Sequence, residues 1–120
     1  MSHIVNVKTE VRDEAAVRAA CIRLGWMQPT TGRFQLYSTS REGLGIVAPD
    51  WRYPIVVNTT TGELDYDNFN GNWGPQRHLD SFLQAYATEK TKLEAAKNGY
   101  SVFEETLPDG SIKLSVTLEA

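Results

Sequence analysis

Glycine and proline interrupt the middle of the chain so often that only short elements fit between them. Between residues 27 and 58 the interruptions are Pro29, Gly32, Gly43, Gly45, Pro49 and Pro54. Proline cannot continue a helix and glycine weakens one, so this stretch is typical of strands joined by turns. We expect strands at 33–38, 44–48 and 53–58, the last of which carries the β-branched run Ile55-Val56-Val57.

The residues before this stretch have the pattern of a strand followed by a helix. In residues 4–12 the side chains of Val5, Val7 and Val11 alternate with polar ones, which is the period of a half-buried strand. Asp13 suits a helix N-cap because its carboxylate can accept hydrogen bonds from the amides of the first turn. We expect the helix to end at Gly25. Its apolar stripe consists of Val17, Ala20, Cys21 and Leu24.

A hairpin and a long helix follow the interrupted stretch. Residues 59–62 are expected to turn the chain into a returning strand at 63–69, with Leu64, Tyr66 and Asn68 on one face. Pro75 suits the first position of a helix, where its missing amide costs nothing. The apolar stripe of this helix consists of Leu79, Phe82, Leu83, Tyr86 and Leu93. Gly99 is expected to end it.

The last segment predicts a second hairpin. Strands at 100–107 and 111–118 are separated by Pro108-Asp109-Gly110, which has the composition of a short hairpin loop. In the second strand apolar and polar residues alternate strictly, so one face is expected to be buried and the other solvated.

This order of elements indicates a single α+β domain over residues 1–120. Strand, helix, several strands, helix and hairpin favour a mostly antiparallel sheet with two helices packed on one face. A ferredoxin-like split arrangement is the first candidate topology. The hydrophobic content of 41% suffices for one two-layer core.

Charge and hydropathy exclude several classes of partner. The 12 Lys and Arg against 15 Asp and Glu give a net charge of −3, which offers no long-range attraction to nucleic acid. No apolar run approaches the roughly 20 residues that span a membrane, and the residues around Met1 do not resemble a secretory signal. We therefore expect a cytoplasmic protein that contacts neither nucleic acid nor membrane.

Side chains that often carry chemistry are few. Cys21 lies on the apolar stripe of the first helix, where cysteine usually acts as a small hydrophobe. His3 and His78 are the two histidines, and their spacing is not that of a zinc site. His78 falls in the first turn of the long helix, where a surface or capping role is expected. We expect no catalytic, cofactor-binding or metal-binding residues, and no cofactor.

A cluster of acidic and amide residues resembles a calcium loop only superficially. Its members are Asp65, Asp67, Asn68, Asn70 and Asn72. Phe69 occupies a position where a calcium loop needs an oxygen ligand if the loop starts at Asp65. Turn-forming residues between a strand and a helix explain the cluster better.

The most distinctive feature is a concentration of aromatic residues and an arginine. Trp51, Arg52 and Tyr53 precede one strand, and Tyr66, Phe69 and Trp73 surround the Asn/Gly-rich loop. Such side chains often anchor interfaces because they combine apolar area with a polar group. We take the candidate partner or ligand surface to be Trp51, Arg52, Tyr53, Tyr66, Asp67, Asn68 and Trp73. The alternative is that these rings fill one end of the core.

Several stretches of the chain together resemble a known family. They are Met1-Ser2-His3-Ile4 with Lys8-Thr9 and Arg12-Asp13, Trp51-Arg52-Tyr53-Pro54, Tyr66-Asp67-Asn68 with Trp73-Gly74, Phe82-Leu83-Gln84-Ala85-Tyr86-Ala87, and Asp109-Gly110-Ser111-Ile112-Lys113-Leu114. The family is a bacterial and plastid one of unknown function, which includes hypothetical chloroplast reading frame thirty-five. The resemblance implies a short intracellular protein, encoded near an ATPase of the AAA class. It supplies no active-site residues.

The sequence therefore favours an accessory or adaptor protein that binds another protein, with an AAA-class ATPase as the partner that the resemblance implies. The alternative function is a small ligand-binding protein or enzyme, in which the aromatics line a pocket and Arg52 holds an anionic small molecule. A further hypothesis is a homodimer formed through an unpaired sheet edge, for instance the C-terminal strand.

Overall fold

The computed structural model describes residues 4–118 and confirms an α+β fold. The elements are β1 (Val5–Lys8), α1 (Glu14–Leu24), β2 (Thr30–Gln35), β3 (Ser40–Ile46), β4 (Ile55–Asn58), β5 (Glu63–Tyr66), the 3-10 turn η1 (Phe69–Gly71), α2 (Gln76–Lys97), β6 (Tyr100–Thr106) and β7 (Ile112–Leu118). Among these elements, neither helix is long and apolar enough to cross a membrane.

The strands form two antiparallel sheets rather than one. The larger sheet has the order β1-β5-β4-β3-β2, and β6 pairs only with β7. A ferredoxin-like arrangement places the strand after the second helix in the same sheet as the others. That topology is not confirmed, because the chain turns back at Gly99, where φ is +78°, and runs along the far side of α2.

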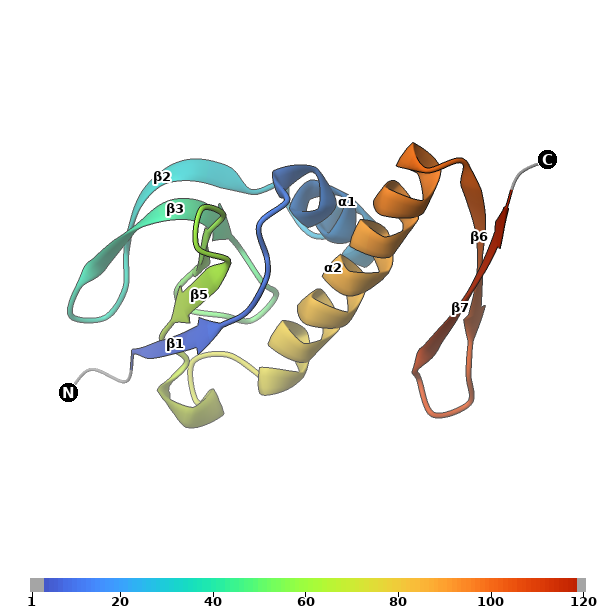
Figure 1. Ribbon diagram of the computed structural model, residues 1–120. Helices are drawn as coiled ribbons and strands as arrows, with labels where there is room; N and C mark the ends of the chain where they lie inside the picture. The colour runs from blue at the N-terminus through green and yellow to red at the C-terminus, as the bar shows by residue number, and fades with distance from the viewer. Residues whose placement is uncertain (1–3, 119–120) are drawn as a thin grey trace.

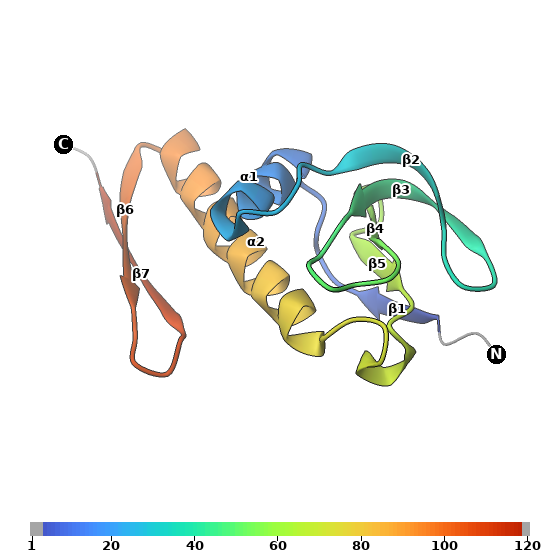
Figure 2. The same cartoon turned by 180° about the vertical axis from the view of Figure 1, so that it is seen from behind.

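The molecule is therefore layered as sheet, helices and hairpin. Figures 1 and 2 show α1 and α2 on one face of the five-stranded sheet, as the element order predicts, with β6 and β7 on the opposite side of α2. Both helices bury their apolar stripes against the sheet, and these side chains make one continuous core. Its largest fully buried members include Phe82, Leu79, Ile46, Ile55, Leu64 and Val17.

The first helix begins and ends where local chemistry predicts. The Asp13 carboxylate accepts from the amides of Ala15 and Ala16. Gly25 adopts φ +73° and closes the helix. The long helix also ends as expected, before Gly99, although Pro75 is its cap rather than its first residue.

Two predicted strands are shifted along the chain. The expected strands at 33–38 and 44–48 are replaced by β2 and β3, which turn back through a bond from the Leu36 amide to the Thr39 carbonyl. Gly32 and Gly43 lie opposite one another inside this hairpin instead of ending its strands. Glycine fits there because a Cβ on Gly43 would overlap the Val57 carbonyl of the neighbouring strand.

An ion-pair network joins the small hairpin to both helices. The Glu104 carboxylate on β6 receives two hydrogen bonds from the Arg23 guanidinium of α1, at 2.8 and 2.6 Å. Lys92 of α2 donates to the same carboxylate at 2.9 Å. The two-pronged arginine contact fixes the orientation of the hairpin as well as its distance from the helices. The turn of the hairpin is held separately, by Gln84 of α2, which donates to the Gly110 carbonyl.

The network predicts a pH-dependent attachment of the hairpin. The Arg23 and Lys92 hydrogen bonds lower the pKa of Glu104 from its ordinary 4.5 to about 2. Because the folded-state pKa is depressed, the stabilisation is complete above about pH 4.5 and is lost as the pH falls toward 2. We expect Glu104→Gln to lower the unfolding free energy by about 1 kcal/mol at neutral pH and by almost nothing near pH 2.

Urea unfolding of both proteins across this pH range measures the difference. Other carboxylates titrate in both proteins and cancel in the comparison. A difference that is absent at neutral pH, or that does not shrink on acidification, contradicts the role assigned to Glu104.

Candidate functional site

Two loops meet at one end of the five-stranded sheet and carry the candidate residues. Residues 47–54 connect β3 to β4, and residues 67–75 connect β5 to α2. Because β4 and β5 are antiparallel neighbours, the start of β4 and the end of β5 lie at the same end. The alternating strand direction thus brings together two segments that are about twenty residues apart in sequence.

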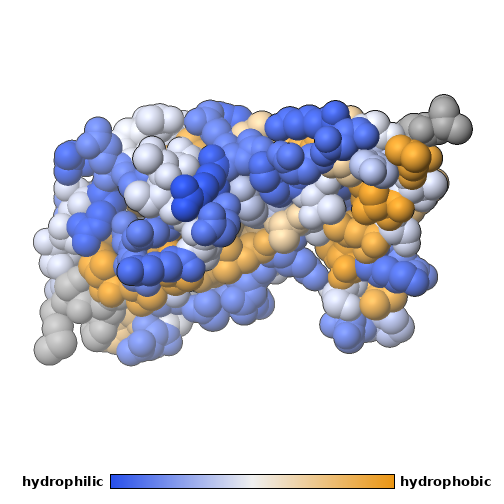
Figure 3. Space-filling view, viewed as in Figure 1, coloured by the Kyte–Doolittle hydropathy of each residue, from blue (hydrophilic) through white to orange (hydrophobic). Residues whose placement is uncertain are grey.

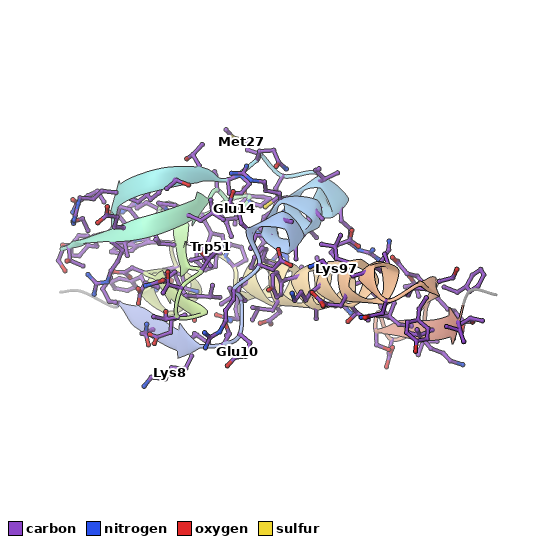
Figure 4. All side chains as sticks on the ribbon, turned by 45° about the horizontal axis from the view of Figure 1, so that its top comes forward. Lys8, Glu10, Glu14, Met27, Trp51 and Lys97 are labelled. Carbon is purple, nitrogen blue, oxygen red and sulfur yellow. The ribbon has the colours of Figure 1, made fainter. Side chains whose placement is uncertain are left out.

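Trp51 locks these loops together from beneath. Its indole Nε1–H donates to the Pro75 carbonyl at 3.0 Å, and its ring lies directly on Gly74. A Cβ at position 74 would overlap the indole ring, so only glycine permits this contact. The Trp51 ring also meets Tyr66 edge to face, with centroids 5.5 Å apart. Figure 4 shows Trp51 within the body of the molecule, on the sheet side of the helices.

Asn68 organises the second loop from within. Its backbone carbonyl accepts from the amides of Gly71 and Trp73, and its side-chain amide donates to the Gly74 carbonyl at 3.2 Å. The residue is buried. These bonds satisfy backbone groups that the irregular loop would otherwise leave unpaired away from water. A further bond, from the Arg52 amide to the Trp73 carbonyl at 2.7 Å, joins the two loops directly.

Trp73 is the centre of a partly exposed group of rings. Its ring centroid lies 5.1 Å from that of Tyr37, 5.7 Å from Tyr53 and 4.7 Å from Phe69. The Arg52 guanidinium carbon lies 5.1 Å from the Trp73 ring centroid, within range of a cation–π interaction. We call these five residues the aromatic platform.

Arg52 brings the accessible positive charge to this platform. The residue is exposed, and within residues 4–118 no carboxylate lies at ion-pair distance from its guanidinium. Its N–H donors therefore remain available to a carboxylate or phosphate, while its guanidinium carbon lies over the Trp73 ring. The platform thus offers flat apolar rings next to an available cation.

The loop that carries Trp73 contains unusual backbone conformations. Phe69 and Asn70 have φ of +46° and +53°, and Gly71 follows at +94°. In the other loop Asp50, next to Trp51, has φ of +62°. Left-handed conformations are costly for a bulky residue such as phenylalanine, and they persist only where surrounding contacts hold them. The Trp51 and Asn68 contacts supply that support, and strained segments of this kind concentrate at functional sites.

The structure divides the seven sequence-predicted residues into two groups. Trp51, Tyr66, Asp67 and Asn68 are buried and support the loops from below. Arg52, Tyr53 and Trp73 are accessible and belong to the platform. The core-packing interpretation therefore applies to the buried group, and the accessible group stays the candidate contact surface.

The surroundings of the buried residues suit a role in supporting the two loops. Burial raises the pKa of the Tyr66 phenol, which stays neutral at physiological pH. The Asp67 carboxylate accepts from the Phe69 amide at 3.3 Å. These buried residues shape the loop from within.

Two platform residues were not among the predicted ones. Phe69 belongs to the aromatic concentration seen in the sequence. Its place in the same Asn/Gly-rich segment as Trp73 is the signal that could have added it to the predicted surface. Tyr37 lies on the connection between β2 and β3 and is 45% exposed. No local pattern links it to Trp73, because the contact depends on how the sheet curls.

The other reactive side chains have structural roles. Cys21 is fully buried in the core, and this burial raises the pKa of its thiol, which disfavours the nucleophilic thiolate. A ring nitrogen of His78 lies 2.7 Å from the Pro49 carbonyl, which ties the start of α2 to the β3–β4 loop. His3 lies outside the described residues. Residues 4–118 contain no cluster of three metal-ligating side chains.

Two clefts lie beside α2, away from the platform. One, of about 470 Å³, lies between the first half of α2 and the β6–β7 turn and is lined by Arg77, Gln84 and Asp109 among others. The other, of about 430 Å³, lies between α2 and the β1–α1 connection, with Val11, Leu83 and Tyr86 in its wall. Neither is lined by a platform residue. The platform residues therefore lie outside both of these clefts.

Comparison with protein-family models, with curated proteins and with solved structures found no match.

The two groups predict different responses to truncation. Asn68→Ala removes the donor to the buried Gly74 carbonyl and should lower the unfolding free energy by about 1–3 kcal/mol. Arg52→Ala removes only an exposed cation–π contact and should cost less than about 1 kcal/mol. Urea unfolding of the two variants measures both values. Equal losses of unfolding free energy in the two variants would contradict the division into buried residues that support the loops and accessible residues of the platform.

Proposed function

We propose that the protein is a cytoplasmic accessory protein that binds another protein through the aromatic platform. The observation that carries this proposal is the Arg52 guanidinium, stacked over the partly exposed Trp73 ring and without a carboxylate partner in residues 4–118. Arginine, tryptophan and tyrosine are the residues most often responsible for binding energy at protein interfaces.

The chemistry of the platform specifies what it binds. Trp73, Tyr53 and Tyr37 offer ring faces and edges to an apolar side chain. Arg52 offers a forked donor to a carboxylate. The proposed ligand is therefore a segment of a partner protein that carries an apolar residue next to an acidic one. The family resemblance suggests an AAA-class ATPase as that partner.

The held conformation of the loops supports binding. A loop that is ordered before binding loses little conformational entropy when the partner arrives. Here the Trp51 ring on Gly74, the Asn68 bonds and the Arg52–Trp73 backbone bond order the loops in the free protein. The strain at Phe69 and Asn70 is consistent with a loop shaped for contact.

The alternative function is a small ligand-binding protein or enzyme with Arg52 as the anion-binding group. Small-molecule sites are concave and surround most of their ligand. The two clefts beside α2 are not lined by the platform residues, and Arg52 is exposed outside them. A surface of this form suits a macromolecular partner better than a small substrate.

The test is affinity isolation of the tagged full-length chain from its native cells, with quantitative mass spectrometry. We expect a partner that wild type retains and that Arg52→Ala and Trp73→Ala each reduce at least about tenfold. Arg52→Lys should give an intermediate loss of partner. Lysine keeps the positive charge, but its ammonium group cannot stack on an aromatic ring or donate two parallel hydrogen bonds to a carboxylate. Lys8→Ala, which removes an exposed cation from β1, is the matched control and should change nothing.

Partner recovery that is unchanged by Arg52→Ala and Trp73→Ala, in variants that unfold like wild type, contradicts the proposal. A partner that is lost as expected but is not an ATPase removes only the ATPase assignment. Tight binding of a small anion at Arg52, with no protein partner lost, favours the alternative function.

A further inference from the structure

The hairpin of β6 and β7 carries more apolar surface than the rest of the chain covers. α2 packs against β6 more extensively than against β7. Tyr100 is 41% exposed, Val116 51% and Leu118 67%. Figure 3 shows hydrophobic surface over the hairpin, at the end of the molecule away from the large sheet. A two-stranded hairpin is marginally stable in water, so apolar side chains that its packing on α2 leaves this exposed are a feature that needs a partner.

The strand register sorts the side chains of the hairpin into two faces. Directly opposed residues share a face, and Val102 opposes Val116 while Tyr100 opposes Leu118. Ile112 and Leu114 lie on this same face because they are spaced by two along β7. Glu104 also lies on it, opposite Leu114 and pointing toward the helices, so this is the face that packs on α2. On the other face Lys113, Ser115 and Thr117 are exposed and polar, although Phe103 of β6, opposite Ser115, is 68% exposed there.

The outer edge of β7 has unpaired backbone groups. β7 pairs with β6 and with no other strand of the described chain. The Leu107 amide donates to the Ser111 carbonyl, which makes that pair the first hydrogen-bonded one of the ladder. Since hydrogen-bonded and non-bonded pairs alternate, the amides and carbonyls of Ile112, Leu114 and Val116 point outward. An edge of this kind is a template for another strand.

The edge of β6 is protected in a way that the edge of β7 is not. Glu104 points toward the helices, where Arg23 and Lys92 hold its carboxylate, and Glu105 follows directly. Inward-pointing and adjacent charges discourage strand addition. Residues 112–118 carry a single charge, Lys113. The β7 edge is therefore the one suited to pairing.

We propose that a second copy of this chain pairs with β7 antiparallel, about a two-fold axis at Ser115, to give a four-stranded sheet. In this register Leu114 faces Val116 of the second copy, and Ile112 faces Leu118. Both are apolar pairs, and their outward backbone groups supply the new hydrogen bonds. Lys113 faces Thr117, so no like charges oppose one another.

Other registers of the same pairing are less favourable. A shift by one residue sets the apolar face of one copy against the polar face of the other. An axis at Lys113 places the two lysines opposite each other. An axis at Val116 leaves the first residues of β7 unpaired. Only the Ser115 axis uses all of residues 112–118 with like faces matched, and this self-complementarity is what a two-fold interface requires.

The first test uses a disulfide to read the register. The two copies of Ser115 form a non-hydrogen-bonded pair, with Cα atoms about 4.5 Å apart, a distance that a disulfide can bridge. Ser115→Cys should therefore crosslink into a dimer under oxidised glutathione. Native Cys21 is buried and gives no background. Lys113→Cys or Thr117→Cys alone is the matched control, since each copy lies about 13 Å from its twin.

Mixing the two control variants provides the positive counterpart. Position 113 of one copy faces position 117 of the other, so the mixture should crosslink although neither variant does alone. Crosslinking of all three single variants to the same extent would indicate random collision and overturn the proposal. Failure of both Ser115→Cys and the mixture would also overturn it.

The second test measures the mass in solution. Sedimentation equilibrium of wild type should show twice the 13.4 kDa chain mass as concentration rises. In the dimer, position 117 of each copy faces Lys113 of the other. Thr117→Lys therefore creates two pairs of opposed lysines, and their repulsion should raise the dimer dissociation constant at least about threefold. Thr117→Glu should lower it by a similar factor. A monomer at every concentration up to about 0.5 mM overturns the proposal. So does a dimer that responds to neither substitution, because it uses another surface.

Discussion

The contact between the Trp51 indole and Gly74 is the interaction on which the candidate site depends. It joins the β3–β4 loop to the β5–α2 loop, and the indole N–H bond to Pro75 fixes the start of α2 to the same point. With that contact in place, the Asn68 bonds can hold Phe69 and Asn70 in left-handed conformations, and Trp73 is directed outward under Arg52. Without it, the platform would be two unconnected loops.

The helix layer separates two surfaces with different physical character. On the sheet side, the platform combines aromatic rings with a cation, and the Arg52 amide bond to the Trp73 carbonyl joins its two loops. On the hairpin side, β7 has an open backbone edge and an apolar face, and the Glu104 network fixes its orientation. A protein with one surface for a second copy and another for a partner would present that partner with two equivalent platforms, which increases avidity when both can engage.

Local chemistry was enough to predict some elements, and tertiary contacts decided the others. Asp13 and Gly25 bound the first helix because capping acts within one turn, and Pro108-Asp109-Gly110 turns the last hairpin for the same reason. Gly32 and Gly43 were predicted to end strands, but they pair inside a hairpin where a neighbouring backbone approaches closely. The aromatic types alone could not separate buried Trp51 from accessible Trp73, because that difference depends on a glycine more than twenty residues from Trp51.

Hydrogen exchange of the indole N–H groups, followed by NMR, tests the central contact most directly. The Trp51 N–H is buried and bonded to Pro75, whereas Trp73 lies at the surface. We expect Trp51 to exchange at least about a hundredfold more slowly than Trp73, and Gly74→Ala to abolish that difference while the helices stay protected. Equal exchange at the two indoles in the wild-type protein would contradict the account, because the loops would then not be locked together.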